Sequence, residues 1–351
     1  MKRNYGIDAL RLVSMFMVTM LHVLAQGGIL YATEPGSLSY WVVWATEIAC
    51  YCAVNCFALI SGYTMSQTQY KVSRLFKVWF HTVFYTVLGV VFFLFFKPEV
   101  VGKKDLVYAL FPVSGGLYWY VSAYFGLLIL TPLLNTILKH TEKRVLGMTL
   151  LAAFVVFCVL PVPFQSNPYK LDKGYSLIWL CLLYLGGGYL RKYDLLRKIK
   201  TSHAWFTVLG AYGLTILSKF VIEQIFGVAS FFYDYRNALI LFTSPTTVLI
   251  AVGLLVLFSK IKFGRMGVGV VRVLSPAALG VYLSHTHPLV WEHLLKGSTM
   301  GLAQRGCLLM VYMLLSVAFL IFLGGLVLDL LRIKLFQLLR IDKLCTRWDT
   351  K

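Results

Sequence analysis

Long apolar runs separated by short polar stretches repeat along the whole chain. Ten of these runs are long enough to cross a hydrocarbon layer of roughly 30 Å, which takes about 20 helical residues. The polar stretches between them leave no room for a sizeable soluble domain. We therefore expect an all-α integral membrane protein, a single domain over residues 1–351 built as a bundle of about ten transmembrane helices. These helices are predicted to begin near Ile7, Trp41, Phe76, Leu117, Val145, Tyr175, His203, Asn237, Pro276 and Cys307.

The composition agrees with this pattern. Hydrophobic residues make up 59% of the chain and charged residues 13%, far from the usual balance of a soluble domain. Residues 1–31 combine a basic start with an apolar run, as a signal peptide does. That run is long for a signal peptide and lacks a convincing small-residue cleavage site, so we interpret it as the first helix.

The basic residues predict the topology. The formal charge of +19 arises mainly from Lys and Arg clusters beside the apolar runs, which disfavours a nucleic-acid-binding face and favours contact with a lipid bilayer. With ten helices, most of the 33 Lys and Arg residues fall on the side of the N-terminus. Adding or removing one helix would erase much of this bias, so the positive-inside rule predicts both termini in the cytoplasm.

Arg11 and His22 are the most informative polar pair, because an ionisable side chain at membrane depth indicates function by default. Eleven residues at about 100° each return close to the same helix face, with the two side chains about 16 Å apart along the axis. Arg11 is then placed to hold a cytoplasmic phosphate and His22 to act as a buried base. Alternatively, Arg11 reaches lipid phosphates and His22 bonds to a neighbouring helix.

A basic stripe begins the third predicted helix. Arg74, Lys77 and His81 stand at positions i, i+3 and i+7, which predicts a second phosphate-binding site at the cytoplasmic end. Anchoring by the positive-inside rule is sufficient to explain the first two residues. It does not explain His81, which lies about two turns deeper.

Glu47 is expected near the depth of His22, on a helix that runs inward from outside. A carboxylate paired with one imidazole nitrogen would fix the tautomer and leave the other nitrogen free to take a proton from an alcohol. Alternatively, the carboxylate of Glu47 faces an outer aqueous cavity. Both interpretations stay open from the sequence.

The run GVYLSHTHPLVWEH contains Tyr282, His285 and His287. On one continuous helix the two imidazoles would point about 200° apart, so only one is expected to face a given cavity. They make a poor metal site, and the cysteines at 50, 52 and 56 are scattered around a helix, so no metal is expected. Signatures of soluble hydrolases, metalloproteases and nucleotide-binding enzymes are absent from the sequence.

Six segments together resemble the membrane-bound acyltransferase 3 family over most of the chain. They are GIDALRLVSMFMVTMLHV, CFALISGYTMS, SRLFKVWF, GGLYWYVSAYFGLLILTPLLN, YLGGGYL and GVYLSHTHPL, in the order of the family. The resemblance implies an acyl-CoA donor, usually acetyl-CoA, reached from the cytoplasm of a bacterial cell. It also implies a hydroxyl acceptor on a cell-surface or lipid-linked glycan.

Carried over by position, the resemblance implies that His22 is the essential histidine and that Arg11 and Arg74 grip the donor. Lys77 stands where arginine is common, which leaves its role open. The substrate-binding residues implied or inferred are Ser61, Trp119, Tyr282 and His285, with His287 as the alternative histidine. His22 is expected to act as a general base or, as a second route, as a transient acyl acceptor.

The main alternative to an enzyme is a membrane protein that transports or delivers a substrate without acyl-transfer chemistry. Related membrane domains occur fused to racemases, where a role in serine uptake has been proposed. The sequence leaves the acceptor, the acyl chain length and the oligomeric state open.

Overall fold

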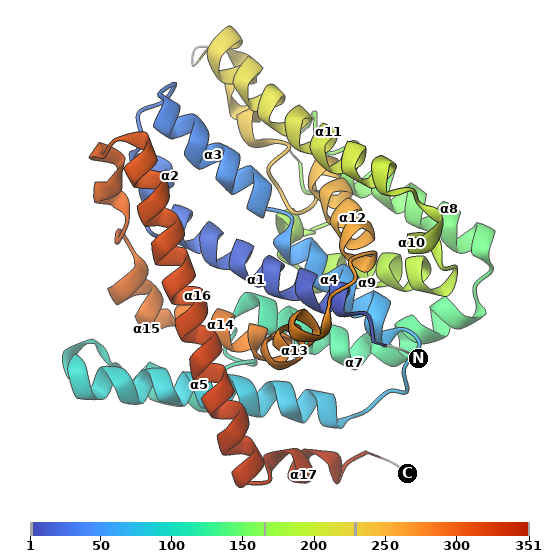
Figure 1. Cartoon of the computed structure of the whole chain (residues 1–351), viewed down its shortest axis with the longest axis vertical. Helices are drawn as coiled ribbons and strands as arrows, with labels where there is room; N and C mark the ends of the chain where they lie inside the picture. The colour runs from blue at the N-terminus through green and yellow to red at the C-terminus, as the bar shows by residue number, and fades with distance from the viewer. Residues whose placement is uncertain (1–2, 165, 228–229, 350–351) are drawn as a thin grey trace. The chain divides into compact units, whose positions relative to one another are not determined.

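A computed structural model describes residues 3–164, 166–227 and 230–349, and every regular element in those ranges is helical (Figure 1). This confirms the all-α class. Within the described ranges, seven helical segments are long and apolar enough to cross a membrane. The number of ten spans and the cytoplasmic position of the termini stay predictions. The seven segments are α1 (Tyr5–Ala25), α3 with α4 (Leu38–Cys50, Ala53–Met65), α5 (Ser73–Phe96), α7 (Trp119–His140), α11 with its π-turn (Thr201–Phe226), α13 with α14 (Arg265–Leu274, Ala278–His285) and α16 (Cys307–Leu338).

Three further helices are shorter: α8 (Lys143–Phe154), α9 (Leu177–Lys192) and the apolar α12 (Pro245–Ser259). Local chemistry sets the start of α12. The hydroxyl of Ser244 accepts the backbone N–H of Thr247, and proline follows at the first helical position. The helix therefore begins at Pro245, whereas the apolar run in the sequence predicted a start near Asn237. The remaining short helices are α2 (Ile29–Ala32), α6 (Lys103–Leu110), α10 (Leu195–Lys198), α15 (Pro288–Val290) and α17 (Ile341–Thr346).

The chain divides into two compact units. The first unit contains Met1–Met17, Trp44–Gln69 and Leu130–Val271, and the second contains Val18–Val43, Tyr70–Ile129 and Arg272–Lys351. Helices α1, α3, α7 and α13 each contain residues of both units. Each unit is therefore assembled from segments that are far apart in the sequence.

Glycines allow close helix packing between α4 and α9 in the first unit. A Cβ added to Gly62 would lie 1.9 Å from the backbone oxygen of Tyr184, and one added to Gly187 would lie 2.1 Å from that of Leu59. Small residues at such positions let helix backbones approach within a membrane. The SGY and GGG motifs thus have a direct structural use in helix packing.

A buried amide ties α4 to its surroundings in the same unit. The side chain of Asn55 donates to the backbone oxygen of Phe242 over 2.8 Å and accepts the indole N–H of Trp179 over 3.0 Å. Because both ends of this buried amide are hydrogen-bonded, its burial carries little penalty.

The second unit is arranged around α5, α14 and α16. Helix α14 packs against both α5 and α16, while α6, α15 and α17 pack against α5. Helix α17 follows the C-terminal end of the long α16, drawn in red in Figure 1. His81, His285 and Asp329 lie on α5, α14 and α16, respectively.

Candidate functional site

Two imidazole rings meet inside the second unit. Nδ1 of His22, on α1, lies 2.8 Å from Nε2 of His285, the last residue of α14. The ring centroids are 5.1 Å apart. Both residues were singled out from the sequence, and the structure brings them into direct hydrogen bonding. This pair is called the histidine dyad below.

The neighbours of the dyad define where its hydrogens lie. Nδ1 of His285 bonds to the backbone oxygen of Val281, one turn earlier on α14. A carbonyl only accepts, so Nδ1 of a neutral His285 carries the hydrogen and its Nε2 is the acceptor. Nδ1 of His22 must then donate to that nitrogen. It follows that Nε2 of His22 keeps its lone pair, as a base requires.

Aromatic rings surround the dyad. The ring of Trp291 meets His22 edge-on with centroids 4.8 Å apart, and that of Tyr282 lies 6.3 Å away. Tyr282 in turn contacts the rings of Tyr118 and Tyr120. Trp119, at the start of α7, packs edge-on against Tyr120. Two predicted substrate residues, Trp119 and Tyr282, therefore belong to one aromatic group, to which the structure adds Trp291.

His287 has a structural position instead. Its Nδ1 accepts the backbone N–H of Leu289 at the start of α15, and its Nε2 faces the backbone oxygen of Thr86. The expectation of one continuous helix across both histidines is wrong, because α14 ends at His285 and a new helix begins at Pro288. Both nitrogens of His287 are thus engaged by the backbone, and His285 is the histidine that contacts His22.

A buried carboxylate organises a second polar group, on α5 and α16. Oδ1 of Asp329 lies 2.7 Å from Nε2 of His81 and accepts the hydroxyl of Tyr85 over 3.1 Å. Arg332 grips both carboxylate oxygens, through Nε over 2.7 Å and Nη2 over 2.9 Å. The side chain of Asp329 has no exposed surface. The sequence analysis missed Asp329 and Arg332, although one carboxylate within a 32-residue apolar helix was a usable signal.

Helix α14 joins the two polar groups. A Cβ added to Gly280 would lie 2.2 Å from Oδ1 of Asp329, so the carboxylate rests directly against the α14 backbone. His285 follows five residues later, about 7.5 Å along the same helix. The ion pair and the histidine dyad are therefore neighbours within one unit.

A cavity of about 300 Å³ opens beside the buried ion pair. Lys77, His81 and Arg332 line it together with Phe336 and Asp342, and we call it the basic cavity. Nζ of Lys77 lies 2.9 Å from Oδ1 of Asp342 on α17. The volume falls at the small end of the range for ligand pockets. Two members of the predicted basic stripe thus line one cavity, and Arg74 lies one turn before Lys77 on α5.

Arg11 lies in the first unit and has an acidic partner. Its Nη1 is 3.1 Å from Oδ1 of Asp8, one turn earlier on α1, and the other oxygen of Asp8 pairs with Arg3. Helix α1 is continuous from Arg11 to His22, as predicted from the sequence. The pairing with Asp8 was not predicted, although the i, i+3 spacing permits it.

Glu47 and Ser61 also lie in the first unit. Glu47 is buried on α3, and among the described residues its Oε2 has no hydrogen-bond partner. The partner of Nδ1 in His22 is His285, where the sequence analysis had suggested Glu47. The hydroxyl of Ser61 donates to the backbone oxygen of Phe57 on its own helix.

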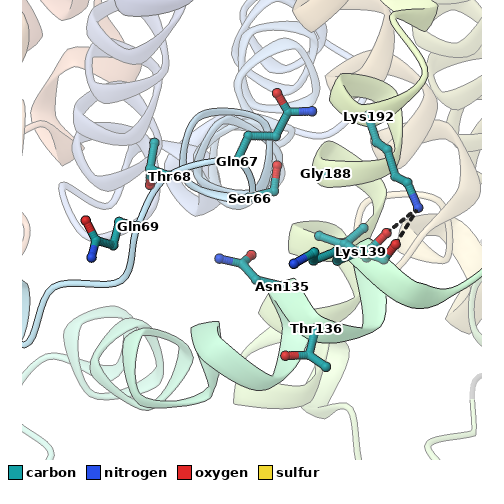
Figure 2. A pocket seen from close by; sticks show the side chains of 10 residues that line it. Ser66, Gln67, Thr68, Gln69, Asn135, Thr136, Lys139, Gly188 and Lys192 are labelled. Carbon is teal, nitrogen blue, oxygen red and sulfur yellow. Dashed lines mark hydrogen bonds between the residues drawn. The ribbon is translucent and has the colours of Figure 1, made fainter.

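A larger pocket in the first unit, of about 490 Å³, is lined mainly by hydroxyl and amide side chains (Figure 2). It lies among residues 66–69 after α4, the end of α7 and the end of α9. The ammonium of Lys192 donates to the backbone oxygens of Leu138, Lys139 and Thr141, which terminate α7. The pocket suits a ligand with many hydrogen-bonding groups, and no motif in the sequence predicted it.

A family model described as an acyltransferase domain matches residues 4–330. The chain belongs to this acyltransferase family. The match includes His22, His285 and Asp329, and it confirms the resemblance seen in the sequence motifs. Together with the apolar helices, it makes the protein a multi-pass membrane acyltransferase. No curated protein and no solved structure matches the chain.

Proposed function

We propose that this acyltransferase transfers a short acyl group, typically acetyl, from cytoplasmic acyl-CoA to a hydroxyl of a cell-surface or lipid-linked glycan in the bacterial cytoplasmic membrane. The observation that carries the proposal is the hydrogen-bond pattern of the histidine dyad. It leaves Nε2 of His22 with an available lone pair, while Nδ1 is held by His285.

The reaction proceeds by proton transfer and attack. Nε2 of His22 takes the proton of the acceptor hydroxyl as its oxygen attacks the thioester carbonyl carbon. The tetrahedral intermediate collapses with cleavage of the C–S bond. The thiolate of CoA then takes the proton from His22, which restores the neutral ring. His285 positions His22 throughout by accepting its Nδ1 hydrogen.

The donor is bound through its phosphates by cations at the ends of the helices. Arg11, Arg74, Lys77 and His81 are the proposed donor-binding residues, and the basic cavity brings two of them together. Arg332 also lines this cavity and adds a third basic group to it. The planar guanidinium of arginine and the ammonium of lysine both suit phosphate oxygens.

The acceptor sugar stacks on the aromatic group beside the dyad, with Trp119 and Tyr282 as binding residues. Glu47 is retained as a second acid–base residue and Ser61 as a residue near the acyl group. Support for Glu47 is its buried carboxylate, whose Oε2 lacks a partner among the described residues.

Release of free CoA tests the proposal and separates it from transport. Purified protein in nanodiscs is mixed with acetyl-CoA, with and without a glycan acceptor, and the free thiol is measured against time. An acyltransferase releases thiol that depends on the acceptor and on His22. A transport protein releases none in either condition, and that result would refute the proposal. If a peptide with acylated His22 is recovered from a quenched reaction, His22 acts as a transient acyl acceptor and not as a general base.

A further inference from the structure

We propose that the basic cavity binds the phosphates of a cytoplasmic phosphorylated ligand and that α17 is a lid on it, with Asp342 occupying a phosphate position when the lid is closed. This inference rests on the proposed function in naming acyl-CoA as the ligand. Beyond that function, it assigns the phosphates to the basic cavity and names the Asp342 carboxylate as a group that competes with them.

The charges around the cavity favour an anionic ligand. The charge of the Arg332 guanidinium is already balanced by Asp329, which accepts two hydrogen bonds from it inside the unit. Among the residues that the structure describes, Lys77 forms its ion pair with Asp342 of the lid, over 2.9 Å. Removal of the lid leaves this ammonium uncompensated beside His81 and Arg332. A phosphate oxygen is the natural replacement for the carboxylate at that place.

A second carboxylate of the C-terminal segment occupies another anion-binding position. Oδ1 of Asp349 accepts the backbone N–H of Ser73 over 2.9 Å, and Oδ2 accepts its hydroxyl over 2.8 Å. Ser73 is the first residue of α5, and helix N-termini bind anions through free N–H groups. Lys77 follows one turn later, about 6 Å along the axis. Two carboxylates therefore occupy adjacent anion positions, a spacing that suits a ligand with more than one phosphate.

Several of the side chains that hold the lid are exposed to solvent. The side chains of Lys77 and Asp342 are 45% and 59% exposed, so their ion pair shifts an equilibrium by about fivefold at most. The ring of Trp348 packs at a tilt against Phe76, with centroids 5.7 Å apart, and remains largely exposed. A ligand with several phosphates offers stronger partners to the same groups.

The lid lies outside the residues that define the family. The family match ends at residue 330, before Arg332 and before α17. His22 and His285 lie in the matched part, while the lid belongs to the C-terminal segment of this chain. We infer that it tunes the affinity for the donor without taking part in the transfer.

Binding of CoA itself tests the inference, since CoA carries the phosphates and no acyl group to transfer. Equilibrium binding is measured on the full chain in nanodiscs for wild type, Asp342→Asn and Asp349→Asn. We expect each variant to bind CoA about two- to fivefold more tightly. Asp194→Asn is the matched control, because Asp194 forms an exposed ion pair with Arg197 in the first unit. Equal affinities in wild type and both lid variants would overturn the inference.

A double-mutant cycle makes the test specific. In a Lys77→Gln background Asp342 has lost its ion-pair partner, so Asp342→Asn should then leave CoA affinity unchanged. An effect that persists in this background would show that Asp342 does not act through Lys77, and the inference would fail. Hydrogen exchange of residues 341–349 is expected to accelerate when CoA binds, and unchanged exchange counts against a lid.

Inorganic pyrophosphate separates this inference from the proposed function. Lid-dependent binding of both pyrophosphate and CoA supports the inference, even for a protein that transfers no acyl group. Acyl transfer with lid-independent binding keeps the proposed function and refutes the lid. Lid-dependent binding of pyrophosphate without any binding of CoA would overturn acyl-CoA as the ligand.

Discussion

His22 donates its Nδ1 hydrogen to Nε2 of His285 across 2.8 Å, and His285 can accept it because its own hydrogen is directed to the backbone oxygen of Val281. The two hydrogen bonds link the backbone oxygen of Val281 through His285 to His22, whose Nε2 is left free to act as a base. The tautomer of His22 is therefore set by the fold.

Replacing His285 should slow catalysis without weakening donor binding. His285→Ala removes the acceptor for Nδ1 of His22, so the ring loses its fixed tautomer, and we expect kcat to fall roughly 10²-fold with an unchanged KM for acyl-CoA. His285→Gln supplies a side-chain oxygen as acceptor and should restore part of the rate. Steady-state kinetics with His203→Ala, an exposed histidine of α11, as control provides the check. A raised KM at unchanged kcat would instead place His285 in donor binding.

Asp329 should be essential for stability. Asp329→Ala leaves the buried Arg332 and His81 without their carboxylate, and breaking a buried ion pair in this way costs roughly 3–5 kcal/mol. Thermal unfolding of the purified protein measures the loss. Asp194→Asn removes an exposed pair at a backbone conformation that asparagine tolerates, and it is expected to cost about 1 kcal/mol or less. Similar melting temperatures for the two variants would contradict the structural role assigned to Asp329.

Gly62 should tolerate no larger residue. A methyl group there would lie 1.9 Å from the backbone oxygen of Tyr184, so Gly62→Ala is expected to force α4 and α9 apart and destabilise the first unit. Gly210→Ala on α11 is the matched control, since nothing lies within 4 Å of its added Cβ. Alanine favours a helix over glycine by roughly 1 kcal/mol, so the control should be neutral or slightly stabilising. Equal melting temperatures for the two variants would contradict the close packing.

Docking of the C-terminal segment should withstand mild acid. The backbone N–H of Ser73, and then its hydroxyl, hold the pKa of the Asp349 carboxyl below its ordinary value, with help from Lys71 and Lys77. A depressed pKa means that the contact is fully present above the ordinary value of about 4 and is lost as pH falls through the lowered one. Hydrogen exchange of residues 341–349 should thus be equally protected at pH 6 and 8, after correction for intrinsic rates. Loss of protection already at pH 6 would show that another group controls docking.

The sequence was sufficient for the features that depend on local periodicity. Apolar runs predicted the all-helical class, and the spacing of Arg11 and His22 placed both on one continuous helix, as the structure has it. The basic stripe also led to the basic cavity, because Lys77 and His81 lie one turn apart on α5. These inferences needed only helix geometry and the cost of polar groups in lipid.

Partners from distant segments could not be predicted in the same way. Equal membrane depth suggested Glu47 for His22, but depth does not say which helices are neighbours, and the hydrogen bond goes to His285. Asp329 is a partner of His81 across 248 residues of sequence, and no spacing rule reaches that far. The break after His285 was missed because helix periodicity was extended through His287 up to Pro288.

The rate of acyl transfer by His22→Ala tests the central claim most directly. Purified wild type, His22→Ala and the control His203→Ala are compared at equal abundance and equal melting temperature, with acetyl-CoA and an acceptor hydroxyl. Loss of a general base should lower kcat by 10² to 10⁴-fold in His22→Ala alone. Transfer by His22→Ala at the rate of the wild type would contradict the account.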